Sequence, residues 1–322
     1  MIARDVHVAA WSPRGLHLAY ARRDGIFVVN ADGRGRKLAR KETGVSIRSL
    51  AWSANNRRLV LTQGRDQNDL EIYTAHADGT NVKPLTSNAV SELQPSWTPD
   101  GRQLAFVRMR GSLGDIWLMD ASGRRQRLVV RDGFSPSWTP DARRIVFTRW
   151  TRGTKPYSTY SVSVSGADER LLVSDGAFSA PSPDGAKLAF LRSSSSPFPF
   201  PAPDQLFTAA ADGSGAKPLT PAAATDSLSW SPDSATLAFV GFPSGGTTPT
   251  GLYTIRADGS GLTHVVSYAA SPSFSPDGAA LAFATQGLLG SQIKVSAVDG
   301  SARRVVLAAR GRNVDPDWQP LP

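Results

Sequence analysis

Short apolar runs separated by polar turns recur along the whole chain at a nearly constant spacing. Each repeat opens with a bulky anchor residue, most often Trp, and a polar turn such as Ser-Pro-Asp-Gly follows. Nine residues after each anchor comes a large apolar residue, in a run such as Leu104-Ala105-Phe106. Runs this short, bounded by turns, are typical of buried strands. The anchors, 41 to 49 residues apart, are Trp11, Trp52, Trp97, Trp138, Pro181, Trp230 and Phe274, and Trp318 follows at the end.

Two further strands complete each repeat. Segments such as Asp115-Ile116-Trp117-Leu118-Met119 continue the apolar pattern and end at a two-residue turn, for example Asp258-Gly259. Such dipeptides supply the positive φ that a tight hairpin needs. A weaker strand such as Arg127-Leu128-Val129 closes the unit. We call these four strands A to D in chain order.

Seven repeats of four strands predict an all-β fold, a seven-bladed β-propeller of four-stranded antiparallel blades that forms a single domain over residues 1–322. A β-sandwich has no reason to keep one nine-residue spacing in seven places, and β-helix repeats are far shorter. The eighth anchor suggests that Asp315-Pro316-Asp317-Trp318 pairs with the first B–C–D set as a closing strand, which would remove exposed strand edges. An incomplete eight-bladed ring is the alternative.

The repeat also resembles a known family. Trp230-Ser231-Pro232-Asp233, Leu237-Ala238-Phe239 and the later Asp258-Gly259 turn are similar to the TolB-type, WD40-like propeller repeat. The resemblance runs from Val8 to Trp318 and is to the propeller alone, without the N-terminal domain of TolB. The repeat serves periplasmic scaffolds, peptidase propeller domains and polysaccharide lyases, so the resemblance implies a fold and leaves the function open.

Composition narrows the compartment and the chemistry only slightly. The chain has no Cys, which excludes disulfides and thiolate chemistry. It has no run of eighteen apolar residues, so we expect no membrane span. Its first residues lack the apolar core of a signal peptide. Because members of the family that the repeat resembles are often exported, we expect a periplasmic or extracellular protein, with the cytoplasm as the alternative. We also expect a monomer.

The net charge of +9 raises the question of an anionic partner. Arginines are spread through every repeat, often beside turns as in Arg57-Arg58 and Arg303-Arg304. Because they form no single stripe, we expect no specific nucleic-acid binding. A basic surface of this kind attracts another protein or an anionic envelope polymer.

Loop length varies on one predicted face only. The interval from the B-strand aromatic position to its C-strand counterpart runs from 7 to 17 residues, whereas the A–B interval never changes. In antiparallel blades the B–C loops and the D–A links share one face. Binding residues are usually found on variable loops of a rigid scaffold, so we expect the binding site there.

Trp150 is the tryptophan that the repeat does not explain. It lies in the long B–C segment of repeat four among basic residues, and the next two B–C loops carry further aromatics. Aromatic residues with arginine are typical of interface hot spots. The alternative is that these aromatics cap the blade edges. The candidate partner-binding residues are Trp150, Arg152, Lys155, Tyr157, Phe198, Phe200 and Phe242.

The sequence shows no constellation of catalytic residues. His17, His76 and His264 fall on different blades, no Gly-x-Ser-x-Gly elbow is present, and only Glu92 is acidic at the position five residues before each anchor. We therefore predict no catalytic residue, no metal and no cofactor, and a non-catalytic protein-binding scaffold at the cell envelope. The alternative is a propeller enzyme or carbohydrate-binding protein that uses the channel mouth, which would need converging carboxylates and His.

Overall fold

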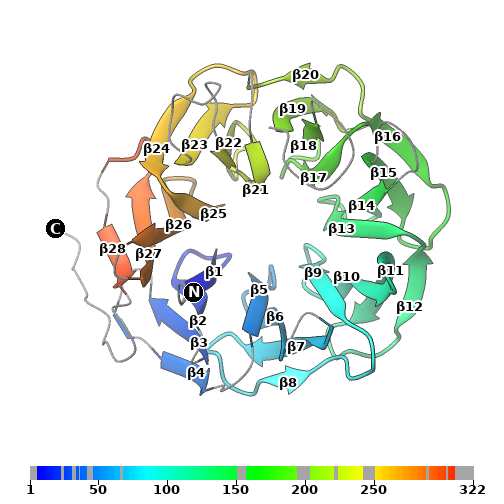
Figure 1. Cartoon of the computed structure of the whole chain (residues 1–322), viewed down its shortest axis with the longest axis horizontal. Coiled ribbons are helices and arrows are strands. Elements are labelled where there is room, and N and C mark those ends of the chain that lie inside the picture. Colours follow the sequence, from blue (N-terminus) through cyan, green and yellow to red (C-terminus); the bar gives the residue numbers. More distant parts are fainter. Residues whose placement is uncertain are drawn as a thin grey trace.

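The chain folds into small antiparallel sheets arranged as a ring of seven blades around a central axis (Figure 1). The computed structural model describes residues 6–22, 25–30, 34–35, 37–41, 46–65, 68–150, 157–193, 204–220, 224–241, 251–287, 290–301 and 304–308. Strand A of each blade lies nearest the centre, and strand D forms the outer rim (Figure 1). The predicted all-β, seven-bladed propeller is confirmed.

Each blade consists of four strands that are consecutive in the chain. The strands of blades one to four are β1 (Val6–Trp11), β2 (His17–Arg22), β3 (Gly25–Asn30), β4 (Lys37–Lys41), β5 (Ser46–Trp52), β6 (Arg58–Gly64), β7 (Leu70–His76), β8 (Lys83–Pro84), β9 (Glu92–Trp97), β10 (Gln103–Arg110), β11 (Leu113–Asp120), β12 (Arg127–Val130), β13 (Gly133–Trp138), β14 (Arg144–Trp150), β15 (Tyr157–Ser163) and β16 (Arg170–Ser174). Those of blades five to seven are β17 (Ala177–Pro181), β18 (Lys187–Ser193), β19 (Asp204–Ala210), β20 (Lys217–Pro218), β21 (Ala224–Trp230), β22 (Thr236–Gly241), β23 (Gly251–Arg256), β24 (Thr263–Ser267), β25 (Ala269–Phe274), β26 (Ala280–Gly287), β27 (Gly290–Ala297) and β28 (Arg304–Ala308).

One hydrogen-bonded turn fixes the spacing between strands A and B. In blade six the Ser231 N–H donates to the Thr236 carbonyl at 2.8 Å, and the Ser231 hydroxyl donates to Asp233 at 2.5 Å and accepts from the Thr236 N–H at 2.8 Å. In blade two Asn55 takes the place of the Asp, and its side-chain oxygen accepts from the Ser53 hydroxyl at 2.8 Å. The backbone bond recurs in all seven blades, which explains the constant interval.

Large apolar side chains of strand B form the centre of each blade. The residue nine positions after the anchor is fully buried in every blade, as predicted: these are Tyr20, Leu61, Phe106, Phe147, Phe190, Phe239 and Phe283. The anchors Trp52, Trp97, Trp138 and Trp230 are buried as well. Trp117 of strand C is only partly buried, and the guanidinium of Arg108 stacks on its ring.

The tryptophan anchors also connect neighbouring blades. The indole Nε1 of Trp138 donates to the Ser96 carbonyl of the preceding strand A at 3.0 Å, and Trp52 and Trp230 make the equivalent bonds. A single residue therefore fills the core of its own blade and fixes the position of the neighbouring blade.

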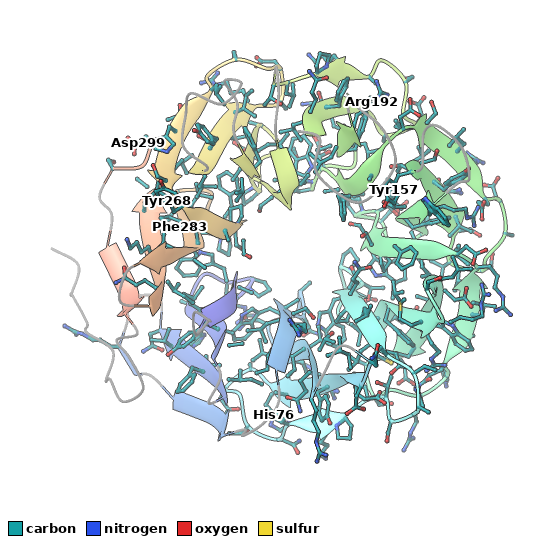
Figure 2. The ribbon with its side chains drawn as sticks, in the orientation of Figure 1. His76, Tyr157, Arg192, Tyr268, Phe283 and Asp299 are labelled. Atoms are coloured by element: carbon teal, nitrogen blue, oxygen red, sulfur yellow. The ribbon has the colours of Figure 1, made fainter. Side chains whose placement is uncertain are left out.

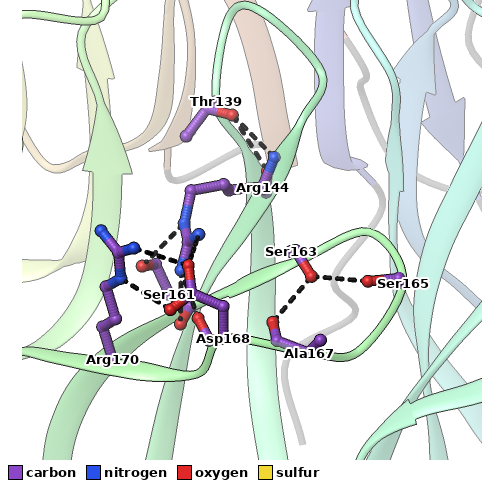
Figure 3. Close-up of polar contacts among 8 residues, drawn as sticks. All are labelled: Thr139, Arg144, Ser161, Ser163, Ser165, Ala167, Asp168 and Arg170. Carbon is purple, nitrogen blue, oxygen red and sulfur yellow. Dashed lines mark hydrogen bonds and ion pairs between the residues drawn. The ribbon is translucent and has the colours of Figure 1, made fainter.

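The turns and the loops lie on opposite faces of the ring. The N–H of Ala121, in the C–D turn of blade three, donates to the Arg102 carbonyl of the A–B turn at 2.9 Å, so both turns share one face, the turn face. The B–C loops and D–A links lie on the other, the loop face. In blade four the C–D turn is Gly166-Ala167-Asp168 in place of Asp-Gly, and Asp168 accepts from Arg144 at 2.9 Å and from Arg170 at 2.7 Å (Figure 3).

Side-chain packing joins the first and last blades. Leu18, Tyr20 and Phe27 of blade one form a single buried cluster with Ile293 and Val295 of blade seven. β1 pairs with β2 as strand A of blade one, so it holds the sheet position in which we expected the Trp318 segment to pair. Trp318 lies outside the described residues. Within the described strands, no blade borrows a strand from the other end of the chain.

Candidate functional site

The loop face of blade four carries the candidate residue Trp150. The sequence placed Trp150 and Tyr157 inside a loop, but they are the last residue of β14 and the first of β15, and they pair across the two strands. The hairpin is longer than expected because the ladder continues past Arg149 and Ser158. Trp150 is 48% exposed, whereas Trp52, Trp97, Trp138 and Trp230 are at most 8% exposed. Tyr157 is half-buried.

The other candidate residues cannot be placed beside this pair. Arg152, Lys155, Phe198, Phe200 and Phe242 lie outside the described residues. The structure therefore brings together Trp150 and Tyr157 of the predicted set.

From the sequence we did not identify a set of arginines that lie two residues after the B-strand aromatic position. Arg108, Arg149 and Arg192 occupy this position in blades three, four and five, and each guanidinium stacks on aromatic rings of its own blade. Beside Trp150, Arg149 bonds the Glu169 carboxylate and donates to the Arg131 carbonyl at 3.1 Å. The constant offset from Phe106, Phe147 and Phe190 was the available signal.

A buried carboxylate organises the loop face of blade three. Asp115 accepts from Arg110 at 3.2 Å, from Arg131 at 2.9 Å and from the Asp132 N–H at 3.1 Å. Burial alone would raise the pKa of Asp115, but these donors and the two positive charges hold it below its usual value. These hydrogen bonds connect strands B and C to the D–A link, and they pair the carboxylate of Asp115 within the protein.

A pair of glutamates, Glu71 and Glu92, lies between blades two and three. Glu92 is fully buried and accepts from Arg108 at 2.7 Å and from Asn88 at 2.6 Å, while Glu71 accepts from the Asn88 N–H at 2.7 Å. Burial and the hydrogen bond with Glu92 raise the pKa of Glu71 to about 7. Each glutamate keeps one buried oxygen for which the described residues supply no donor, and a proton on Glu71 supplies one towards Glu92.

The described histidines do not converge. His17 stacks near Trp52 at 6.3 Å, His76 bonds Asn81 at 3.0 Å, and His264 tilts against Tyr253 at 5.0 Å, on blades one, two and six. Among the residues that the structure describes, no three His, Cys, Asp or Glu side chains are grouped so that they could hold a metal. A search of the same residues finds no helix long and apolar enough to cross a membrane.

Comparison with known proteins decides the family. The model of the TolB beta propeller domain matches residues 4–173, more than half of the chain. This chain belongs to the TolB β-propeller family. Its relatives include the Tol-Pal system protein TolB of Coxiella burnetii, 40% identical over 80 residues, and the TolB homolog of Chlorobium luteolum, 34% identical over 115 residues. These matches cover 24% and 34% of this chain but only 18% and 26% of the relatives.

Solved structures share the TolB-type propeller fold at low sequence identity. TolB from Acinetobacter baumannii matches with a TM-score of 0.58 at 17% identity, over 88% of this chain and 77% of that one. Oligogalacturonate lyase from Vibrio parahaemolyticus matches with 0.70 at 11% identity, over 91% and 89%. The propeller domain of the Trilobed protease from Pyrococcus furiosus, described as having an open velcro topology, matches with 0.70 at 12% identity, over 96% and 97%. At such identities the likeness concerns the fold alone.

Proposed function

We propose that this TolB-type propeller is a non-catalytic scaffold at the cell envelope that binds another protein through the loop face of blades four to six. The observation that carries the proposal is the half-exposed indole of Trp150, in contrast to the buried anchors Trp52, Trp97, Trp138 and Trp230. Aromatic residues beside arginine are enriched at the centres of protein interfaces. The family match supports the envelope location, because its relatives include a protein named for the Tol-Pal system.

The charge of the chain fits a partner with an acidic surface. The net charge of the chain is +9. Complementary charge speeds association and fixes the orientation of a complex. We therefore favour an acidic protein over an anionic envelope polymer as the partner.

The test is the double variant Trp150→Ala with Phe198→Ala. Truncating a central interface aromatic commonly costs about 2 kcal/mol, which is roughly a thirty-fold loss of affinity. We expect capture of the partner from envelope fractions to fall by this factor while the melting temperature stays unchanged. Leu16→Ala is the matched control, because Leu16 is 57% exposed and lies in an A–B turn on the opposite face. A large drop in melting temperature would mean that the aromatics cap the blades.

The alternative function is that of a propeller enzyme or carbohydrate binder at the channel mouth. The fold is compatible with such an activity, since oligogalacturonate lyase shares it, although the likeness itself concerns the fold alone. Purified protein that turns over polyuronates, with activity that survives further purification, would favour this alternative over the scaffold.

A further inference from the structure

Three consecutive blades carry an arginine in the same structural position. The guanidinium of Arg108 lies 4.4 Å from the Trp117 ring centre, that of Arg149 lies 4.9 Å from Tyr160, and that of Arg192 lies 4.5 Å from Phe207. Each also lies over the B-strand aromatic of its own blade. The rings hold the guanidinium flat and leave its edge for hydrogen bonds.

In blades three and four this edge is met by side chains of the protein itself. Arg108 donates to Glu92 at 2.7 Å and to Gln126 at 2.8 Å. Arg149 makes a two-bond pair with Glu169, one bond being 3.0 Å. Gln126 and Glu169 occupy equivalent places, each nine residues after the C-strand aromatic of its blade.

Blade five has neither acceptor at the equivalent positions. The position equivalent to Gln126 and Glu169 is Ala216, and the position equivalent to Glu92 is Gly176. A Cβ at Gly176 would lie 3.1 Å from the Phe190 ring, so this position does face the stack on which Arg192 lies.

Arg192 is left with unmet hydrogen-bonding capacity. Its Nε is buried without an acceptor, and no described residue accepts a hydrogen bond from its guanidinium. A charged donor that gives up water without gaining an acceptor is costly. In the equivalent sites a carboxylate meets the guanidinium: Glu92 accepts from the Nε of Arg108 in blade three, and Glu169 accepts from the two terminal nitrogens of Arg149 in blade four.

We propose that Arg192 is the recognition point for an acidic side chain of the partner, whose carboxylate takes the place that Glu169 fills in blade four. The inference rests on the function proposed above and names the chemistry of its partner. Arg192 lies in blade five, next to blade four with Tyr157 (Figure 2). The two blades are in direct contact there, since the Phe178 N–H of blade five donates to Thr148 of blade four at 3.2 Å.

The experiment follows the arginine Nε–H resonances of the full chain by NMR during titration with an Asp-rich hexapeptide at about 0.15 M salt, where screening weakens non-specific attraction. We expect the Arg192 resonance to shift and that of Arg149 to stay in place. Ala216→Glu introduces the internal acceptor of blade four and should weaken the response roughly tenfold or more, as charge-assisted hydrogen bonds require. Arg192→Gln should abolish peptide binding at this site.

Arg143→Ala is the matched control, because it lowers the net charge by one, as Ala216→Glu does, at an exposed residue of the turn face. Equal weakening by Arg143→Ala and Ala216→Glu would overturn the proposal, since binding would then follow net charge alone. A shift of Arg192 by inorganic phosphate, without one by the acidic peptide, would overturn it too.

The same variants separate this inference from the proposed function. If Trp150→Ala with Phe198→Ala abolishes partner capture while Ala216→Glu leaves it intact, the scaffold function stands and the role of Arg192 is wrong. If neither variant affects capture, the proposed binding face is wrong.

Discussion

Individual charged residues of blades three and four are largely satisfied within the protein. Asp115 is held by Arg110 and Arg131, and Glu169 is held by Arg149. Such pairs fix side chains in place and add little affinity for outside ligands. Arg192 differs because its blade supplies neither acceptor, and this difference is why we assign it a partner group.

The pair of Glu71 and Glu92 makes stability depend on pH. The pKa of Glu71 is raised to about 7 from 4.5, so the folded state binds a proton that the unfolded state releases. The free energy of unfolding therefore falls as the pH rises from about 4.5 to 7 and levels off above pH 7.

The variant Glu71→Gln tests this dependence, because its side-chain amide still donates towards Glu92 but does not titrate. We expect the wild type to lose on the order of 1 kcal/mol across this window, because solvent screens part of the interaction, and Glu71→Gln to lose much less. Parallel curves of melting temperature against pH would contradict this account.

At the scale of elements, local bonds were predictable and distant ones were not. The A–B turn could be predicted because its hydrogen bonds span at most five residues, as in Ser231 to Thr236. Arg108 and Glu92 are sixteen residues apart, and Arg149 and Glu169 are twenty apart. The residues of each pair meet because of the register between strands. The pairing of strands A and B in these blades contains register shifts, which the spacing of the repeats does not reveal.

A matched pair of tryptophans measures how much the hydrogen bonds between neighbouring A strands contribute to the free energy of unfolding. Trp138 donates to the Ser96 carbonyl at 3.0 Å, whereas the buried Nε1 of Trp97 finds no acceptor in the described part of the chain. Trp138→Phe should cost about 1 kcal/mol more than Trp97→Phe, because it alone removes a hydrogen bond. Urea unfolding of the two variants measures the difference, and equal losses would mean that the indole bond does not hold the blades together.

At the scale of the whole ring, side chains of blades seven and one pack together in one buried cluster. Ile293 is fully buried in this cluster. Ile116 occupies the equivalent position, one residue before the C-strand aromatic position, and is fully buried at the junction of blades three and four. The closing strand expected at Trp318 stays a prediction, because that segment lies outside the described residues and a count of anchors does not distinguish strand exchange from packing.

Ile293→Ala and Ile116→Ala compare the two junctions. If packing closes the ring, each should cost about 2–5 kcal/mol, the usual range for a large-to-small change in a core. The free energies of unfolding measure both. A cost at Ile293 far below that at Ile116 would show that something other than this cluster closes the ring.

The central claim is that the loop face around blades four and five binds a partner, and site-specific crosslinking in the organism that makes the chain tests it most directly. A photoreactive residue placed at Trp150 is compared with one at Leu16, since both side chains are about half exposed but lie on opposite faces. The account predicts one discrete crosslinked protein from position 150, weakened by Ala216→Glu, and none from position 16. The same products from both positions, or a discrete product from position 16 alone, would contradict it.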